Sequence, residues 1–355
     1  MTRLLIAIET SCDETAAAVV ADDFVVRSSV VSSQVDLHAR YGGIVPEIAS
    51  RAHVSLLLPV VAEALERAEV ELEDLSAVAV TQGPGLIGAL LVGISAGKAL
   101  AMSRSLPVVA VNHLEGHLAS VLLADPAAPY PQLALLVSGG HCILARATAP
   151  GLYERLGHTR DDSVGEAYDK VARMLGLGYP GGPPLDRLAA KGKETIAFPR
   201  PMLHEGYDFS FSGLKTAVAN YLRANPGHVA EDVACSFVEA CMDVLCTKLA
   251  RALEEFHDPV VSVVGGVAAS PILRQRVEAL AAGTESTLLL PPSPLATDNA
   301  AMIGLAGWLR LSARSGQGDE LSFGPVPSLP LSWSYDRPEG GDDVRGSGPG
   351  RARKR

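Results

Sequence analysis

Short apolar runs separated by polar turns open the chain. Residues 4–8, 16–20 and 24–31 are each apolar over a length typical of a strand, and polar residues fill the segments between them. Apolar runs of this length bounded by polar turns favour buried β-strands. The pattern predicts a β-meander whose first hairpin tip, at residues 9–15, is acidic and rich in hydroxyl groups.

The spacing of apolar residues then changes to that of helices. From about Pro46, apolar side chains recur at nearly every third or fourth position, which predicts a long amphipathic helix. A second amphipathic helix is expected at 232–257. Between them, a strand at 78–81, a glycine-rich loop at 82–85 and a helix at 86–103 form a layout that can present backbone N–H groups to an anion. The buried stripe expected for the first helix is Ile48, His53, Leu57, Val61 and Leu65.

The strand–turn–strand pattern recurs in the second half of the chain. Residues 133–137 and 142–147 are apolar runs on either side of the tight turn 138–141, and a third apolar run at 260–264 ends in Gly265-Gly266. Glycine in such turns lets backbone N–H groups approach phosphates closely. Because repetition of one structural unit indicates duplication, we expect an α/β protein with two ribonuclease-H-like lobes. A nucleotide would bind in the cleft between them.

Composition is that of an ordinary globular protein. The 355 residues are 48% hydrophobic and 20% charged, and their number suggests two domains or lobes. The N-terminal apolar run is too short for a signal peptide, and the longest apolar stretch, 86–102, contains Lys98, so we expect no membrane span. The five cysteines lack Cys-x-x-Cys spacing, which favours reduced thiols and a cytoplasmic protein.

Charge is distributed unevenly along the chain. The net charge of −10 argues against general nucleic-acid binding. The last eleven residues nevertheless contain five basic side chains, and residues 334–355 are expected to form a disordered basic tail. Such a tail could contact RNA phosphates, or it could simply solubilise the end of the chain.

Two histidines four residues apart, His113 and His117, are the strongest candidates for metal ligands. On a helix these positions share one face, where two imidazoles can bind one divalent ion. Asp298, after the proline-rich loop 291–294, is the best candidate for a third ligand. The pair could also arise by chance on a surface or in a core. Glu115 is not adjacent to His113, so the general base of a His-Glu-x-x-His protease is missing.

Residues 161–186 are dense in polar side chains and glycine. Glu166, Asp169 and Lys170 fall on adjacent turns of an expected helix. Carboxylates in this segment could bind ribose hydroxyl groups, as acidic residues do in other nucleotide-binding folds. They could equally form a solvated helix face.

Eight motifs in their order along the chain resemble those of one family, the universal tRNA N6-adenosine threonylcarbamoyltransferases, formerly regarded as glycoproteases. The resemblance covers residues 4–333. Two departures from the family pattern are Ser270, where asparagine is usual, and Leu114, where methionine is common. The motifs are Glu-Thr-Ser-Cys-Asp-Glu-Thr (9–15), Gly-Gly-Ile-Val-Pro-Glu (42–47), Thr-Gln-Gly-Pro-Gly (81–85), Asn-His-Leu-Glu-Gly-His (112–117), Val-Ser-Gly-Gly-His (137–141), Gly-Tyr-Pro-Gly-Gly (178–182), Phe-Ser-Phe-Ser-Gly-Leu-Lys-Thr (209–216) and Thr-Asp-Asn (297–299).

The resemblance implies an actin-like ATPase fold with an interlobe cleft. The N-terminal lobe would span residues 1–118 and be completed by a C-terminal helix at about 298–333, and the C-terminal lobe would span 119–297 with a helical insertion. The resemblance also implies one divalent metal ion, iron by family or zinc, held by His113, His117 and Asp298. The implied substrate contacts are Leu136, Val137, Ser138, Gly139, Gly140, Asp169, Gly182, Asp186 and Ser270.

The implied reaction moves a threonylcarbamoyl group from threonylcarbamoyl-AMP to the N6 amine of the adenosine 3′ of the anticodon, in tRNAs that read codons beginning with A. Asp13 or Glu14 could accept the amine proton. The implied partners are tRNA, a paralogous subunit and a small ATPase. Two rival interpretations are a metalloprotease, disfavoured by the place of Glu115, and a non-catalytic nucleotide switch or sugar-kinase-like protein, in which the two histidines and Asp298 would have no evident role.

Overall fold

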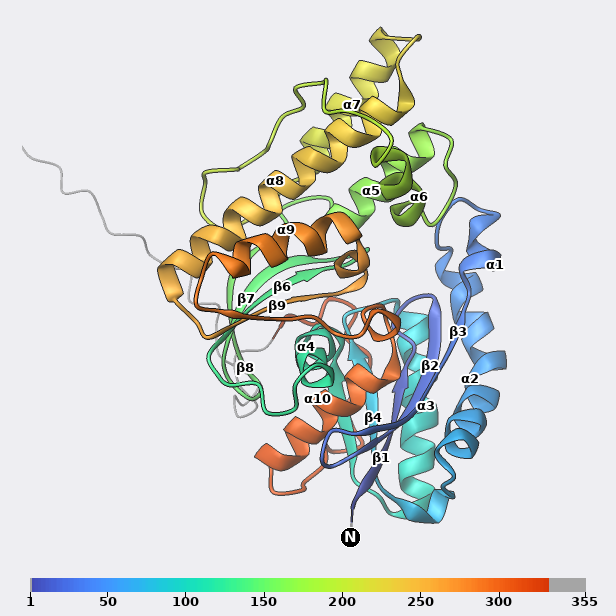
Figure 1. The fold of residues 1–355 in the computed structure, drawn as a ribbon. Coiled ribbons are helices and arrows are strands. Elements are labelled where there is room, and N and C mark those ends of the chain that lie inside the picture. Colours follow the sequence, from blue (N-terminus) through green and yellow to red (C-terminus); the bar gives the residue numbers. More distant parts are fainter. Residues whose placement is uncertain (1, 332–355) are drawn as a thin grey trace, which may run out of the picture.

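The computed structural model describes residues 2–331, which form two lobes, each built around a five-stranded sheet (Figure 1). The strands of the first sheet are β1 (Leu4–Glu9), β2 (Glu14–Ala21), β3 (Val26–Ser33), β4 (Leu75–Gly83) and β5 (Val108–Asn112). Their order across the sheet is β3-β2-β1-β4-β5. The β1–β2 and β2–β3 pairs are antiparallel, whereas the β1–β4 and β4–β5 pairs are parallel.

The second sheet repeats this topology. Its strands are β6 (Gln132–Val137), β7 (Cys142–Ala149), β8 (Leu152–His158), β9 (Val260–Val264) and β10 (Thr287–Leu289), in the order β8-β7-β6-β9-β10. The β6–β7 and β7–β8 pairs are antiparallel, and the β6–β9 and β9–β10 pairs are parallel. Each lobe is therefore ribonuclease-H-like, and the duplicated fold expected from the sequence is confirmed.

Helices cover both faces of the first sheet. The long helices α2 (Pro46–Ala68) and α3 (Ile87–Arg104) lie on one face, and α10 (Ala300–Ala313) with the short α4 (His113–Ala119) covers the other. Alternate residues of β1 reach the two layers, since Leu5 packs with α10 and Ile6 packs with α2 and α3. Gly304 lets α10 approach closely, because a Cβ there would lie 2.6 Å from Val20. The last described helix thus belongs to the first lobe.

The second lobe is completed by five helices, which lie above the sheet in Figure 1. They are α5 (Val164–Met174), α6 (Gly182–Ala189), α7 (Ser212–Ala224), α8 (Ala230–Phe256) and α9 (Pro271–Ala282). Phe237 and its neighbours on α8 form the centre of an extensive core cluster. The shorter helices of the chain are α1 (Val35–Ala39) and the 3-10 turns η1 (Leu72–Asp74), η2 (Ser120–Leu123), η3 (Gly266–Ala269) and η4 (Ser293–Leu295).

The structure also differs from the expectations in local detail. The buried positions of α2 are Ala49, His53, Leu57, Val60 and Ala64, so three of the five residues expected in the stripe are off by one position. The small alanine side chains let α2 pack closely against the first sheet, and the larger neighbouring side chains lie at the edge of this contact. β8, β10 and α7 were not expected. The basic tail expected at 334–355 lies outside the described residues.

Two helices, α2 and α3, are long and apolar enough to cross a membrane by length and composition alone. Both pack against strands of the first sheet and against each other, as helices of a globular lobe do. They are therefore weak evidence for a membrane span. The five cysteines are free thiols.

Candidate metal centre and adjoining cavity

The helix that bears the two histidines begins directly at the end of a buried strand. Asn112, the last residue of β5, caps α4 by accepting a hydrogen bond from the Leu114 backbone N–H at 2.9 Å. All seven residues of α4 are buried. Gly116 lets the helix lie against α10, because a Cβ there would be 2.9 Å from Ile303. The sequence thus places His113 and His117 on a rigid element between the lobes.

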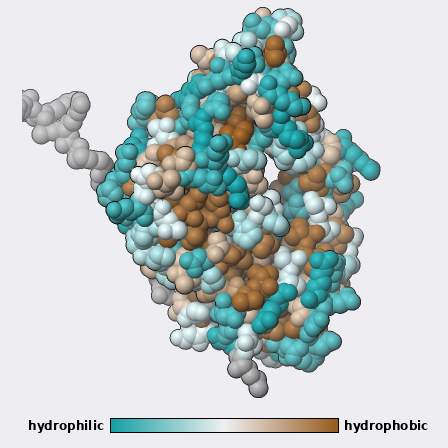
Figure 2. All heavy atoms as spheres, viewed as in Figure 1, coloured by the Kyte–Doolittle hydropathy of each residue, from teal (hydrophilic) through white to brown (hydrophobic). Residues whose placement is uncertain are grey.

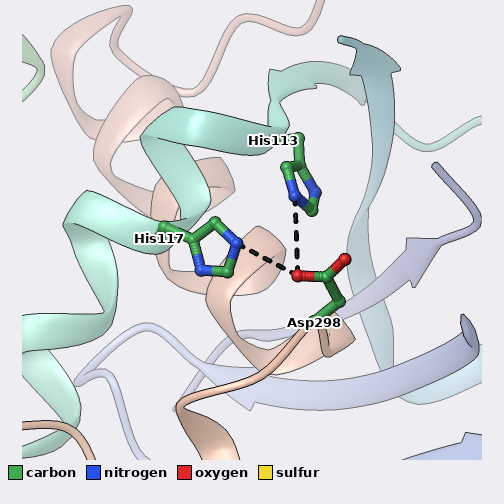
Figure 3. A group of neighbouring side chains, drawn as sticks. All are labelled: His113, His117 and Asp298. Atoms are coloured by element: carbon green, nitrogen blue, oxygen red, sulfur yellow. Dashed lines mark ion pairs between the residues drawn. The ribbon is translucent and has the colours of Figure 1, made fainter. Parts of the chain in front are cut away.

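His113, His117 and Asp298 lie close together (Figure 3). The Nε2 atom of His117 is 3.1 Å from Oδ1 of Asp298, and Nε2 of His113 is 3.6 Å from the same oxygen. The three candidate ligand atoms all lie within 4.8 Å of one another. Asp298 reaches the histidines from the segment between η4 and α10, which the sequence separates from α4 by almost the whole second lobe.

The donor set fits a divalent cation. Nε2 of His117 is buried and has no hydrogen-bond partner among the described residues, apart from its ion-pair contact with Asp298. Two imidazoles and one carboxylate are ligands that zinc and iron accept, and they leave further coordination positions open. Burial would raise the pKa of Asp298, but the two imidazoles lower it far below its usual range, so the carboxylate is ionised.

Glu9 orients the first histidine. Its Oε2 lies 3.0 Å from Nδ1 of His113, and it accepts a hydrogen bond from the Thr81 hydroxyl at 2.7 Å. A carboxylate on Nδ1 holds the ring so that Nε2 points at the metal position. Burial alone would lower the pKa of His113, but the carboxylates of Asp298 and Glu9 raise it to about 9. Sequence reasoning missed Glu9, although it opens the first of the eight motifs.

A third histidine, His141, lies near the triad. Burial, together with repulsion from His113 and His117, lowers the pKa of His141 to about 4, so its ring is neutral at neutral pH. His141 ends the turn between β6 and β7. In the sequence, His141 stands out only as the last residue of a motif, and its position after two glycines at a lobe tip is the signal that indicates a role in the site.

Glu115 does not face the metal position. It is 2% exposed, and its Oε2 lies 3.6 Å from Nε of Arg310. This placement agrees with the expectation that the helix lacks a protease-type general base. The metalloprotease interpretation therefore gains no support from α4.

The acidic hairpin tip lies beside the triad. Burial is the main reason that the pKa values of Asp13 and Glu14 are raised, and the nearby Asp298 carboxylate adds to the rise of both. The pKa of Glu14 rises to about 7, and its Oε1 accepts a hydrogen bond from Ser33 at 2.9 Å. His53 of α2 supports the tip through contacts with the Cys12 carbonyl at 2.9 Å and the Thr15 hydroxyl at 2.8 Å.

The Ser138–His141 turn is fixed against the start of α5. The Ser138 hydroxyl accepts a hydrogen bond from the His141 backbone N–H at 3.1 Å, and the Ser163 hydroxyl donates to the Gly139 carbonyl at 2.6 Å. A Cβ at Gly165 would lie 2.5 Å from the Ser138 carbonyl, so glycine is required for this approach. The turn thus carries His141 toward the triad and Gly139 toward the second lobe.

Gly139 borders a cavity of about 480 Å³ in the second lobe. Its walls come from α5, α6, the η3 turn and the start of α9, and they are mostly apolar. This volume and a largely apolar lining with few polar groups are typical of a small-molecule site. The residues that line it are Gly139, Gly165, Tyr168, Asp169, Pro180, Gly182, Pro183, Asp186, Arg187, Ala190, Gly266, Val267, Ala269, Ser270, Pro271 and Ile272.

The expected substrate residues divide into two groups. Gly139, Asp169, Gly182, Asp186 and Ser270 line the cavity. Ser270 is the N-cap of α9, and its hydroxyl accepts a hydrogen bond from the Leu273 N–H. Burial raises the pKa of Asp186, and a hydrogen bond with the Ser270 hydroxyl partly offsets that rise. The others do not line the cavity: Leu136 and Val137 are fully buried in β6, Ser138 is 7% exposed, and Gly140 is exposed at the turn.

Relatives of known name match nearly the whole chain. The family model for tRNA N6-adenosine threonylcarbamoyltransferase (TsaD) matches residues 25–305. The tRNA N6-adenosine threonylcarbamoyltransferase of Halalkalibacterium halodurans is 50% identical over 335 residues, covering 93% of this chain and 96% of that protein. The protein of the same name from Trichlorobacter lovleyi is 51% identical over 335 residues, covering 92% and 97%.

Solved structures of lower identity share the fold. HypF from T. kodakarensis superposes with a TM-score of 0.61 at 15% identity, over 88% of this chain and 48% of that chain. Component A of the Acidaminococcus fermentans (R)-2-hydroxyglutaryl-CoA dehydratase superposes with a TM-score of 0.52 at 14% identity, over 89% of this chain and 100% of that chain.

The fold and site define a two-lobed protein of the actin-like ATPase class with a candidate His-His-Asp metal centre. Within that class, the chain belongs to the tRNA N6-adenosine threonylcarbamoyltransferase family.

Proposed function

We propose that this chain transfers the threonylcarbamoyl group of threonylcarbamoyl-AMP to the N6 amine of the adenosine 3′ of the anticodon in tRNAs that read codons beginning with A. The observation that carries the proposal is the cluster of His113, His117 and Asp298 beside the cavity, in a chain about half identical to tRNA threonylcarbamoyltransferases. Such a cluster next to a nucleotide-sized cavity suits acyl transfer from an adenylate.

The chemistry needs positioning more than covalent catalysis. The adenosine amine is a poor nucleophile, because its lone pair is delocalised into the purine. The donor already carries a good leaving group, so the protein mainly has to align the two reactants and stabilise developing charge. A metal bound by His113, His117 and Asp298 would supply Lewis acidity toward a carbamoyl or phosphate oxygen.

The chain's own residues take defined parts in this proposal. Asp169 and Asp186 in the cavity accept hydrogen bonds from ribose hydroxyls, and the turn at Ser138–Gly140, of which Gly139 lines the cavity, approaches the adenylate with its backbone. Asp13 or Glu14 accepts the amine proton. Glu14 is the better candidate, because a pKa of about 7 lets a carboxylate act as a base near neutral pH.

The proposal includes a partner subunit. The net charge of −10 disfavours tRNA binding by this chain alone, so the partner shares in binding the tRNA. We assign the docking of the paralogous subunit to the α2–α3 patch, defined as Val54, Leu58, Ile87 and Leu91, which are 52–71% exposed. The patch is continuous, since α2 and α3 touch where a Cβ at Gly88 would lie 2.5 Å from Ser50. The small ATPase acts on this pair.

Several further features belong to the same proposal. The bound ion is iron or zinc, the protein acts in the cytoplasm, and no membrane takes part. The lobes divide at residues 118 and 297, with the C-terminal helix at about 298–333 completing the first lobe. The assignment of the C-terminal helix to the first lobe is supported by the packing of α10 on β1 and β2.

The experiment that tests the transfer is mass analysis of tRNA nucleosides after depletion of this protein. Threonylcarbamoyladenosine should disappear, and it should return when the wild-type chain is supplied again. If the modified nucleoside persists at its normal level in depleted cells, the proposed function is wrong. The protease interpretation would instead be favoured if the protein cleaved a polypeptide, if a chelator stopped that cleavage, and if tRNA had no effect on it.

A further inference from the structure

The described part of the chain ends in a strap, defined as residues 324–331, which forms no helix or strand and lies against the first lobe. The strap holds the loop between β4 and α3 by backbone hydrogen bonds. The Val326 N–H donates to the Gln82 carbonyl at 2.9 Å, and the Pro327 carbonyl accepts from the Gly85 N–H at 3.1 Å. The strap thus fixes a loop whose sequence, Thr-Gln-Gly-Pro-Gly, is one of the eight motifs.

On its other side, the same loop touches a residue beside the metal position. The Leu86 N–H donates to the Ser11 carbonyl at 2.8 Å. A Cβ at Gly85 would lie 2.5 Å from that carbonyl oxygen, so this close approach requires glycine. The Ser11 hydroxyl oxygen lies 3.2 Å from Nδ1 of His113. The loop is therefore held between the strap and Ser11, which contacts a candidate metal ligand directly.

The strap also holds the start of α4, the helix that bears both histidines. Nδ2 of Asn112 donates to the Pro330 carbonyl at 2.7 Å, while Oδ1 of Asn112 accepts from the Leu114 N–H. Asn112 is buried, so water competes little for these hydrogen bonds. Leu331 is buried in the same apolar cluster as Leu114 and Leu118. The end of the strap is thus fixed to α4 by one polar and one apolar anchor.

The position of His113 explains why such support matters. His113 is the first residue of α4, which has only seven residues. Short helices are marginally stable by themselves, and their ends fray. A metal site needs its ligands held within about 0.5 Å of the binding geometry. The ring of His113 therefore depends on contacts from outside its own helix.

We propose that the strap positions the metal centre, through Asn112 at the start of α4 and through the β4–α3 loop and Ser11 at the ring of His113. Asn112 and Leu331 are positioning residues in this account, since neither belongs to the three candidate ligands. The presence of a metal at this centre rests on the proposed function. The strap and the metal site are almost the whole length of the chain apart in sequence from Ser11, so only the fold brings these parts together.

The test is a titration of the full-length protein with Co²⁺, followed by visible absorption, for the wild type, Asn112→Ser and Leu331→Ala. Serine can still accept from the Leu114 N–H, but it is too short to donate to Pro330. Each variant should bind Co²⁺ about three- to tenfold more weakly, less than the loss of about 10–100-fold typical of groups that touch a metal ligand directly. The absorption bands of bound Co²⁺ should also shift, because the ligand geometry changes.

Two controls separate positioning from general stability. Val277→Ala makes a cavity in the core of the second lobe, so it should lower the urea midpoint but leave Co²⁺ affinity and spectrum unchanged. Leu321→Ala changes an exposed side chain just before the strap and should match the wild type throughout.

The proposal is overturned if Asn112→Ser or Leu331→Ala keeps the wild-type affinity and spectrum. It is also overturned if Val277→Ala weakens binding equally, or if the wild type shows no saturable Co²⁺ binding. The titration contains neither adenylate nor tRNA, so its outcome is distinguishable from the loss or persistence of threonylcarbamoyladenosine in depleted cells.

Discussion

At the scale of single residues, the candidate metal centre depends on Glu9 as well as on His113, His117 and Asp298. The spacing of His113 and His117 places them on one helix face from local geometry alone. Glu9 contacts His113 because β1 and β5 end at the same edge of one sheet, where β4 separates them. No local pattern encodes that contact.

Glu9→Gln should weaken metal binding by about 10–100-fold, because a neutral amide holds the His113 ring less firmly and makes it a poorer ligand. Metal titration of the purified protein measures this. Glu73→Gln, which breaks an exposed ion pair with Arg104, is the control and should bind metal normally. Equal affinities for the two variants would contradict the role of Glu9.

Glu14→Gln should stabilise the metal-free protein at high pH but not at low pH. Burial raises the folded-state pKa of Glu14 to about 7, so below the unfolded value of about 4.5 the carboxyl is protonated in both states. Between about 4.5 and 7 the unfolded chain is ionised at this position while the folded chain keeps its proton, so the wild type loses stability as the pH rises, and the loss levels off above about 7.

The difference in free energy of unfolding between the variant and the wild type should therefore grow by about 1–2 kcal/mol from pH 5 to pH 8. This is less than the pKa shift alone would give, because the carboxyl group is partly solvated. Urea unfolding at the two pH values measures the difference. A difference that does not change with pH would show that Glu14 is not destabilised by ionisation.

At the scale of elements, the strongly periodic segments were predicted well and the short ones were not. α3 and α8 begin and end within two residues of the expected positions, because long apolar stripes and left-handed residues at Ser105 and His257 define them. β10 has three residues and is held by pairing with β9, so its own sequence carries little signal. The α2 stripe was misplaced because alanine and larger apolar residues compete for the buried face.

Asn299→Ala should destabilise the protein by about 1–3 kcal/mol and also weaken metal binding. Asn299 caps α10 by accepting from the Met302 N–H at 3.1 Å, and it donates to the carbonyls of Leu295 and Thr297, which hold the segment that carries Asp298. Chemical unfolding and metal titration measure the two effects.

Ser163→Ala removes the comparable cap of α5 together with the hydrogen bond to the Gly139 carbonyl, and neither contact involves His113, His117 or Asp298, so it should lower stability without changing metal affinity. If both variants leave metal affinity unchanged, the Asn299 cap does not position Asp298. A loss of affinity in both would mean that general destabilisation, rather than the cap, weakens the site.

At the scale of the whole molecule, repetition of strand, turn and strand was enough to predict two lobes. It was not enough to predict the cavity, whose walls come from segments between residues 139 and 272 that the fold brings together. The lobes also touch directly, since the guanidinium of Arg173 on α5 donates to the Gly42 carbonyl of the first lobe. Figure 2 shows apolar surface across the middle of the molecule and mostly hydrophilic side chains at the upper end.

Leu58→Asp should abolish docking of the paralogous subunit without loss of thermal stability, because Leu58 is 71% exposed and belongs to the α2–α3 patch. Analytical ultracentrifugation of the mixed subunits measures the association. Val229→Asp, at an exposed apolar position in the other lobe, is the matched control and should leave docking intact. Normal association of Leu58→Asp would place the partner on another surface.

The central claim is that a cation held by His113, His117 and Asp298 is required for transfer to tRNA. The most direct measurement is the yield of threonylcarbamoyladenosine in a reconstituted reaction with purified adenylate, tRNA and partner subunits, using the metal-depleted chain and the same chain reloaded with iron or zinc. The account predicts product from the reloaded wild type, and none from the depleted chain or from reloaded His117→Ala. Equal product from depleted and reloaded protein would contradict it.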